Sequence, residues 1–75
     1  MKELLEYLVK ALVDEPDQVQ ITEVEKDGAL LFEVHVSPHD LGRVIGRQGR
    51  TANALRLVAR AAARNRERVL VEIIS

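Results

Sequence analysis

Two glycines three residues apart are the feature that most constrains this chain. Gly46 and Gly49 enclose Arg47 and Gln48 and lie between two segments whose apolar residues recur at helical spacing. Glycine can adopt a positive φ and lets another backbone approach closely, whereas a larger side chain would block that approach. The pattern therefore predicts a tight loop that opens a helix.

The side chains in and around this loop suit a phosphate ligand. Arg47 contributes a cation and Gln48 an amide donor, and Arg43 and Arg50 flank the two glycines. Guanidinium groups form paired hydrogen bonds with phosphate oxygens, and N–H groups at the start of a helix attract anions. Because two glycines at this spacing also occur in ordinary turns, the interpretation depends on the pattern on either side.

Charge is divided unevenly along the chain. Residues 1–40 contain three lysines and ten acidic residues, a net charge of −7, whereas residues 41–75 contain eight arginines and two acidic residues, a net charge of +6. The total of −1 would by itself argue against a nucleic-acid ligand, but the positive half contains the glycine loop. A local cluster of positive charge matters more than the total, so we expect a polyanionic ligand there. The plainer alternative is that these arginines only solvate a helix face.

Length and composition predict one small domain, residues 1–75. A chain of this size buries about 60% of its unfolded surface, which predicts modest stability. The sequence has no cysteine, which excludes disulfides and cysteine-based metal sites. Charged residues interrupt the apolar N-terminal segment, which matches neither a signal peptide nor a membrane span, and we expect a cytoplasmic protein without a cofactor. These charged residues are Lys2, Glu3, Glu6 and Lys10.

The first half of the chain predicts a helix followed by a β-hairpin. Residues 2–13 carry an apolar stripe at helical spacing. Residues 18–25 and 30–36 alternate as strands, and Asp27-Gly28 between them suits a two-residue hairpin turn. The helical stripe consists of Leu4, Leu5, Leu8, Val9 and Leu12.

This turn fixes the register of the two strands. The numbers of opposite residues sum to 55, which pairs Ile21 with Val34 on the buried face. Val24 and Leu31 then pair on the other face. Glu23 is the exception, because the register places it on the buried face. We therefore expect either that the first strand lies at the edge of the sheet or that the loop is longer than two residues.

A short helix is predicted before the glycine loop. Ser37 suits its N-cap, Pro38 its first position and Asp40 its third. The helix then presents three apolar side chains, Leu41, Val44 and Ile45.

The helix predicted after the loop, residues 50–64, carries more apolar surface than contact with one sheet requires. Its polar residues gather within an arc of about 120°, and they are Arg50, Asn53, Arg56, Arg60 and Arg64. Leu55, Ala59 and Ala62 suffice for packing on the sheet. The adjoining face predicts a dimer in which two copies of this helix pack together. That face consists of Ala54, Leu57, Val58 and Ala61, with the alternative that Val58 belongs to the core.

Residues 68–74 predict a closing strand. Val69, Val71 and Ile73 share one face of it, while Leu70 and Ile74 lie on the other, which predicts burial on both faces.

The segment Val44-Ile45-Gly46-Arg47-Gln48-Gly49, within the order helix, strand, strand, helix, helix, strand, resembles the signature of type II KH domains. The resemblance implies an α+β fold with a three-stranded mixed sheet covered by helices on one face. It also implies a loop that clamps about four nucleotides of a single strand, with bases in an aliphatic groove beside the second strand. Self-association and pairing with a larger multi-domain KH protein are implied as well. Leu41, Val44 and Ile45 are the groove candidates, and the sequence does not distinguish which of them line the groove and which belong to the core.

Several other classes of function do not fit the sequence. His35 and His39 have no cysteine or carboxylate cluster beside them in the pattern, so we expect neither a metal site nor an enzyme. The loop lacks the Lys-Ser/Thr ending of a P-loop. Tyr7 and Phe32 are the only aromatic residues, which excludes binding on an aromatic sheet surface as in RRM and oligonucleotide-binding folds.

The sequence thus favours a non-enzymatic RNA-binding module, with RNA not distinguished from single-stranded DNA. An interaction protein with a vestigial or peptide-filled groove is the alternative. A third reading is a KH domain cut from a larger ribosome- or nuclease-associated protein, against which we weigh Met1 and the end at Ser75.

Overall fold

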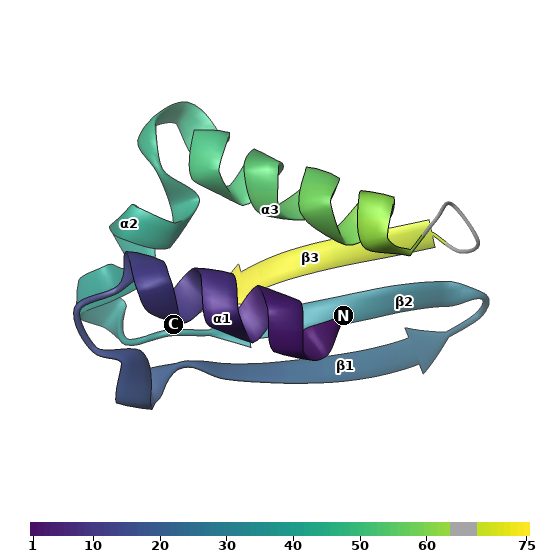
Figure 1. Ribbon diagram of the computed structural model, residues 1–75, viewed down its shortest axis with the longest axis horizontal. Helices are drawn as coiled ribbons and strands as arrows, with labels where there is room; N and C mark the ends of the chain where they lie inside the picture. The colour runs from purple at the N-terminus through teal and green to yellow at the C-terminus, as the bar shows by residue number, and fades with distance from the viewer. Residues whose placement is uncertain (64–67) are drawn as a thin grey trace.

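The computed structural model describes residues 1–63 and 68–75 (Figure 1). Its main elements are α1 (Lys2–Leu12), β1 (Gln20–Lys26), β2 (Ala29–His35), α2 (Leu41–Ile45), α3 (Arg50–Ala62) and β3 (Arg68–Ile74). Short 3-10 turns at Pro16–Gln18, Pro38–Asp40 and Arg47–Gly49 link some of them. This order confirms the predicted α-β-β-α-α-β arrangement. Arg64, predicted as the end of the last helix, lies outside the described residues.

The sheet is mixed, as expected, with strand order β1-β2-β3. β1 and β2 are antiparallel, and β2 and β3 are parallel. Asp27 and Gly28 both have positive φ, 51° and 76°, which fits the type I′ turn that matches the twist of a hairpin.

The predicted register is confirmed, because Ile21 pairs with Val34 and Val24 with Leu31. Glu23 does lie opposite Phe32. It stays exposed because β1 is an edge strand, so the loop need not be longer than two residues.

One face of the sheet is covered by α1 and α3, which lie over the same side in Figure 1. Phe32 is completely buried there, and full burial of such a side chain contributes about 1.5–3 kcal/mol. The core cluster beneath the helices consists of Leu5, Val9, Val19, Ile21, Phe32, Val34, Val36, Val44, Leu55, Ala59, Val69 and Val71.

The prediction that β3 is buried on both faces is wrong. Leu70 is 43% exposed, and Val24, on the same face of the sheet, is 37% exposed. Only one face receives the helices, so alternate residues of β3 project away from the core. Ile74 is half-buried on that second face.

The residues that pack α3 onto the sheet differ by one from the prediction. Leu55 and Ala59 are buried, as predicted, but Ala62 is exposed and Ala52 is buried in its place. Ala62 is the last residue of the helix and lies about 50° from the centre of the stripe that Ala52, Leu55 and Ala59 define. None of the described helices is long and apolar enough to cross a membrane.

Candidate nucleic-acid interface

The backbone conformation of the loop between α2 and α3 requires glycine at position 46. Gly46 has φ 78° and ψ 171°, and its N–H donates to the carbonyl of Gly42 at 2.9 Å. A Cβ added to Gly46 would overlap Oγ1 of Thr51 and lie 2.8 Å from the Thr51 backbone nitrogen. The need for glycine is therefore internal to the protein, whereas the sequence suggested only the approach of another backbone.

Gly49 serves a different purpose in the same loop. Its φ is 76°, and an added Cβ would meet nothing within 4 Å. Its N–H donates to the carbonyl of Gly46 at 3.2 Å, which closes the turn before α3. Gln48, which is not glycine, also has a positive φ of 56°. Such a conformation costs a side-chain-bearing residue about 1–2 kcal/mol, so the rest of the loop holds it there.

The three arginines predicted for this site differ in their partners. Arg43 forms ion pairs with Asp14, at 3.2 Å, and with Asp40, at 3.9 Å. Within residues 1–63 and 68–75, Arg47 and Arg50 form no ion pair, and both are exposed. Arg47 and Arg50 thus present the uncompensated positive charge of the loop.

The three residues predicted to line the groove, Leu41, Val44 and Ile45, differ in how far they are buried. Val44 is completely buried in the core. Ile45 is 38% exposed and Leu41 is half-buried. Ile45, next to Gly46, is therefore the most exposed of the three side chains. Of the three candidates for lining a groove, Val44 belongs to the core, and Ile45 and Leu41 remain.

A buried carboxylate fixes the other end of α2. Asp40 is completely buried and accepts hydrogen bonds from the N–H groups of Asp14 and Glu15, both at 2.9 Å, and from the Ser37 hydroxyl at 3.3 Å. Burial alone would raise the pKa of Asp40, but these three hydrogen bonds and the charge of His39 together lower it below its usual value. Asp40 therefore joins the segment after α1 to the start of α2.

Sequence reasoning missed this arrangement in two respects. Ser37 was predicted to cap a helix that begins at Pro38, but Pro38–Asp40 form a 3-10 turn and α2 begins at Leu41. The Ser37 hydroxyl caps no N–H group, and its single proton is shared between Glu15, at 2.9 Å, and Asp40, at 3.3 Å. His39 is exposed, but the expectation that no carboxylate cluster lies beside it is wrong. Its Nε2 lies 3.3 Å from a carboxylate oxygen of Asp14, in a group with Asp40 whose nitrogen and oxygen atoms are all within 4.8 Å of one another. A buried aspartate cannot be recognised from its neighbours in sequence, because its donors are 25 and 26 residues away.

Chemically, this group is satisfied by the protein. Arg43 lies within ion-pairing distance of both Asp14 and Asp40, and backbone N–H groups occupy both oxygens of Asp40. These contacts are those of a structural junction between α1 and α2.

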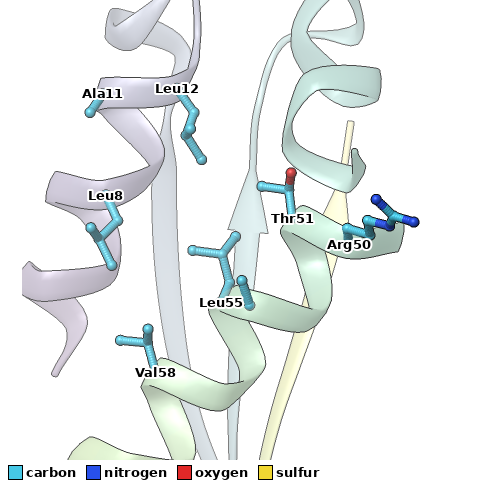
Figure 2. Close-up of a pocket in the computed structure, with 8 residues that line it drawn as sticks. Leu8, Ala11, Leu12, Arg50, Thr51, Leu55 and Val58 are labelled. Carbon is cyan, nitrogen blue, oxygen red and sulfur yellow. The ribbon is translucent and has the colours of Figure 1, made fainter. Parts of the chain in front are cut away.

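A second concave surface lies between α1 and α3. It is an apolar groove of about 440 Å³, and Figure 2 shows side chains of α1 facing those of α3 across it, with Arg50 and Thr51 at the end next to the loop. Its lining residues are Leu8, Ala11, Leu12, Arg50, Thr51, Ala54, Leu55 and Val58.

The fold and the loop define the class of type II KH domains. That class has a helix, a hairpin, two helices around a Gly-x-x-Gly loop and then a parallel strand. Comparison with known proteins agrees, because the family model described as the KhpA/KhpB KH domain matches residues 2–73. The chain belongs to this family.

Relatives match along the whole chain. The RNA-binding protein KhpA of Clostridium acetobutylicum is 52% identical over 75 residues, which are 99% of this chain and 100% of the relative. The proteins of the same name from Clostridium perfringens and Chlamydia pneumoniae are 49% and 44% identical, over 99% of this chain and 100% and 96% of their own lengths. No solved structure matches the chain.

Proposed function

We propose that this chain is a non-enzymatic RNA-binding protein that holds about four nucleotides of single-stranded RNA at the Gly46–Gly49 loop. The observation that carries the proposal is the loop itself, where Arg47 and Arg50, which form no ion pair within residues 1–63 and 68–75, lie beside a turn that has no space for a Cβ at Gly46. The relatives named above as RNA-binding proteins support the choice of ligand.

In this proposal Arg47 and Gln48 donate hydrogen bonds to phosphate oxygens, and Arg50 adds positive charge at the start of α3. Ile45 supplies apolar contact to a base. Arg43 contributes less than the other two arginines, because Asp14 and Asp40 already offset its charge. Phosphate contacts carry little base information, so sequence preference is expected to be weak.

One short groove binds RNA weakly, and pairing of two domains raises the affinity through avidity. We place the pairing surface on α3 at Ala54, Leu57, Val58 and Ala61. Leu57 is 65% exposed, and Ala54 and Val58 border the apolar groove of Figure 2, into which a partner's Leu57 would fit. The partner is a second copy or a KhpB-like multi-domain KH protein, in a complex that acts as an RNA chaperone or post-transcriptional regulator.

The ligand is tested by titrating a labelled single-stranded RNA, with single-stranded DNA of the same sequence in parallel, at several salt concentrations. Phosphate-led binding weakens with salt, with a log–log slope of about −0.7 for each phosphate neutralised. Absence of binding, or binding that does not change with salt, would instead favour a protein-interaction module with a vestigial groove.

The pairing surface is tested with Ala61→Glu. This variant should be monomeric, should bind RNA more weakly through loss of avidity, and should keep its circular dichroism spectrum. Wild-type protein that sediments as a monomer at about 100 μM would contradict a micromolar self-association.

A further inference from the structure

The face of the sheet turned away from the helices carries side chains in ordered rows across the three strands. Its central row is apolar, because the register aligns Val24 with Leu31 and Leu31 with Leu70. Val24 is 37% and Leu70 43% exposed, and Leu31 is half-buried. We call these three residues the apolar row.

Rows of opposite charge lie on the two sides of the apolar row. Lys26 aligns with Ala29, and Ala29 with Arg68, which makes one side basic. On the other side Glu33 aligns with Glu72, which makes it acidic. We call these the basic row and the acidic row.

These charges have no ion-pair partners within the described part of the chain. Arg68 and Glu72 are four residues apart on one strand, a separation of about 13 Å, which is too long for an ion pair. Glu33 and Glu72 are like charges on neighbouring strands, an arrangement that destabilises a sheet unless a cation lies nearby. A cation supplied by another molecule would remove this repulsion.

The order of the three rows determines which two-fold axis could relate this face to the same face of a second copy. A two-fold axis along the strands would place each charged row against its own kind. A two-fold axis along the apolar row instead places the basic row of one copy against the acidic row of the other. Arg68 then meets Glu72, Lys26 comes close to Glu33, and the two apolar rows meet at the centre.

We propose that this open sheet face binds a second copy of the same chain about a two-fold axis along the apolar row. The face is about 23 Å by 14 Å for three seven-residue strands. That is well below the roughly 800 Å² per partner of a standard interface, so the contact is weak, with a dissociation constant of about 0.1 to 1 mM. It is separate from the α3 surface and does not require RNA.

The test uses charge exchange in the Ala61→Glu background, where the proposed α3 contact is absent. One variant carries Lys26→Glu and Arg68→Glu, and the other carries Glu33→Lys and Glu72→Lys. Each alone places like charges against each other, and we expect its association at about 1 mM, measured by sedimentation equilibrium, to fall at least tenfold. An equimolar mixture restores both pairings and should associate within about threefold of the parent.

A mixture that associates no better than either variant alone overturns the proposal, and so does a parent that remains monomeric at about 1 mM. If circular dichroism shows that a double variant does not fold, the single exchanges Arg68→Glu and Glu72→Arg give the same comparison. The loop double variant Arg47→Asp with Gln48→Asp should associate like the parent, which separates this surface from the RNA site.

Discussion

The two ends of α2 use charged side chains in opposite ways. At its start, Asp40 and Arg43 are held by partners within the chain, and the carboxylate is completely buried. At its end, Arg47 is exposed and, among the described residues, unpaired. Residue type alone therefore does not separate an arginine that is paired within the chain from one whose charge is available to a ligand, whereas the presence of an acidic partner does.

The largest effect on RNA binding is expected at the end of α2, in the loop that contains Arg47. Arg47→Asp with Gln48→Asp should abolish RNA binding, because two carboxylates replace phosphate donors on an exposed loop. The circular dichroism spectrum should not change. Arg60→Asp with Gln18→Asp is the matched control, since it makes the same change in net charge away from the loop. Binding of a labelled oligonucleotide within about twofold of wild type would show that the loop is not the site.

The second effect concerns the backbone of the loop. Gly46→Ala should weaken RNA binding more than Arg47→Ala, because the new Cβ collides with Thr51 and the turn must change shape. It should also lower the free energy of unfolding by about 1–3 kcal/mol, the cost of a strained backbone. Gly49→Ala, which has space for a Cβ, is the control and should lose less of both. Titration at fixed salt and urea unfolding measure the two losses, and equal binding losses for Gly46→Ala and Arg47→Ala would contradict this ranking.

At the start of α2, where Asp40 is buried, a substitution should change the stability of the fold and leave RNA binding nearly unchanged. Asp40→Asn replaces one of the two acceptor oxygens by an N–H₂ group, which then faces the N–H donor of either Asp14 or Glu15, so the free energy of unfolding at pH 7 should fall. RNA affinity of the folded protein should stay within about threefold, because the substitution leaves the loop residues unchanged. A loss of affinity as large as that of the loop double variant would break the distinction between the two ends.

The pH dependence of stability follows from the same residue. Because the pKa of Asp40 is lower in the folded protein, its contribution is present above the unfolded pKa of about 3.9 and is lost as pH falls through the folded value. Asp40→Asn should therefore flatten the acid limb of a plot of unfolding free energy against pH below about pH 4. An unchanged acid limb would mean that the carboxylates of other residues produce it.

The smallest effect is expected for Arg43. Arg43→Ala should weaken RNA binding less than Arg47→Ala does, because its charge is already offset by Asp14 and Asp40. Asp14→Asn should raise affinity slightly, because exposed ion pairs of this kind are worth about 0.2–1 kcal/mol and their loss frees the arginine. If Arg43→Ala and Arg47→Ala have equal effects on affinity and on its salt slope, the ion pairs do not distinguish the two arginines.

Local patterns in the sequence were sufficient for much of the fold. Asp27-Gly28 requires a specific turn, and that turn with period-two alternation gives the register of β1 and β2. The glycines at 46 and 49 marked the loop for the same reason, since few residues other than glycine adopt a positive φ.

What the sequence did not predict depends on contacts between distant segments. The burial of Asp40 requires residues 14 and 15 to reach it across the fold. The exposure of Leu70 could not be read from an apolar strand, because it depends on which face the helices cover. The choice of Ala52 over Ala62 depends on how α3 is rotated on the sheet, and alanines of equal hydrophobicity do not specify that rotation.

The fit of Gly46 against Thr51 has a kinetic consequence. Because Gly46 lies against Thr51 in the first turn of α3, we expect the loop to keep its shape when a ligand arrives and to lose little conformational entropy. Encounter should then be governed by long-range attraction to Arg47 and Arg50, and the association rate should fall as salt is added. In the proposed function Ile45 contacts the RNA only after encounter, so its substitution should change mainly the residence time of the RNA on the protein.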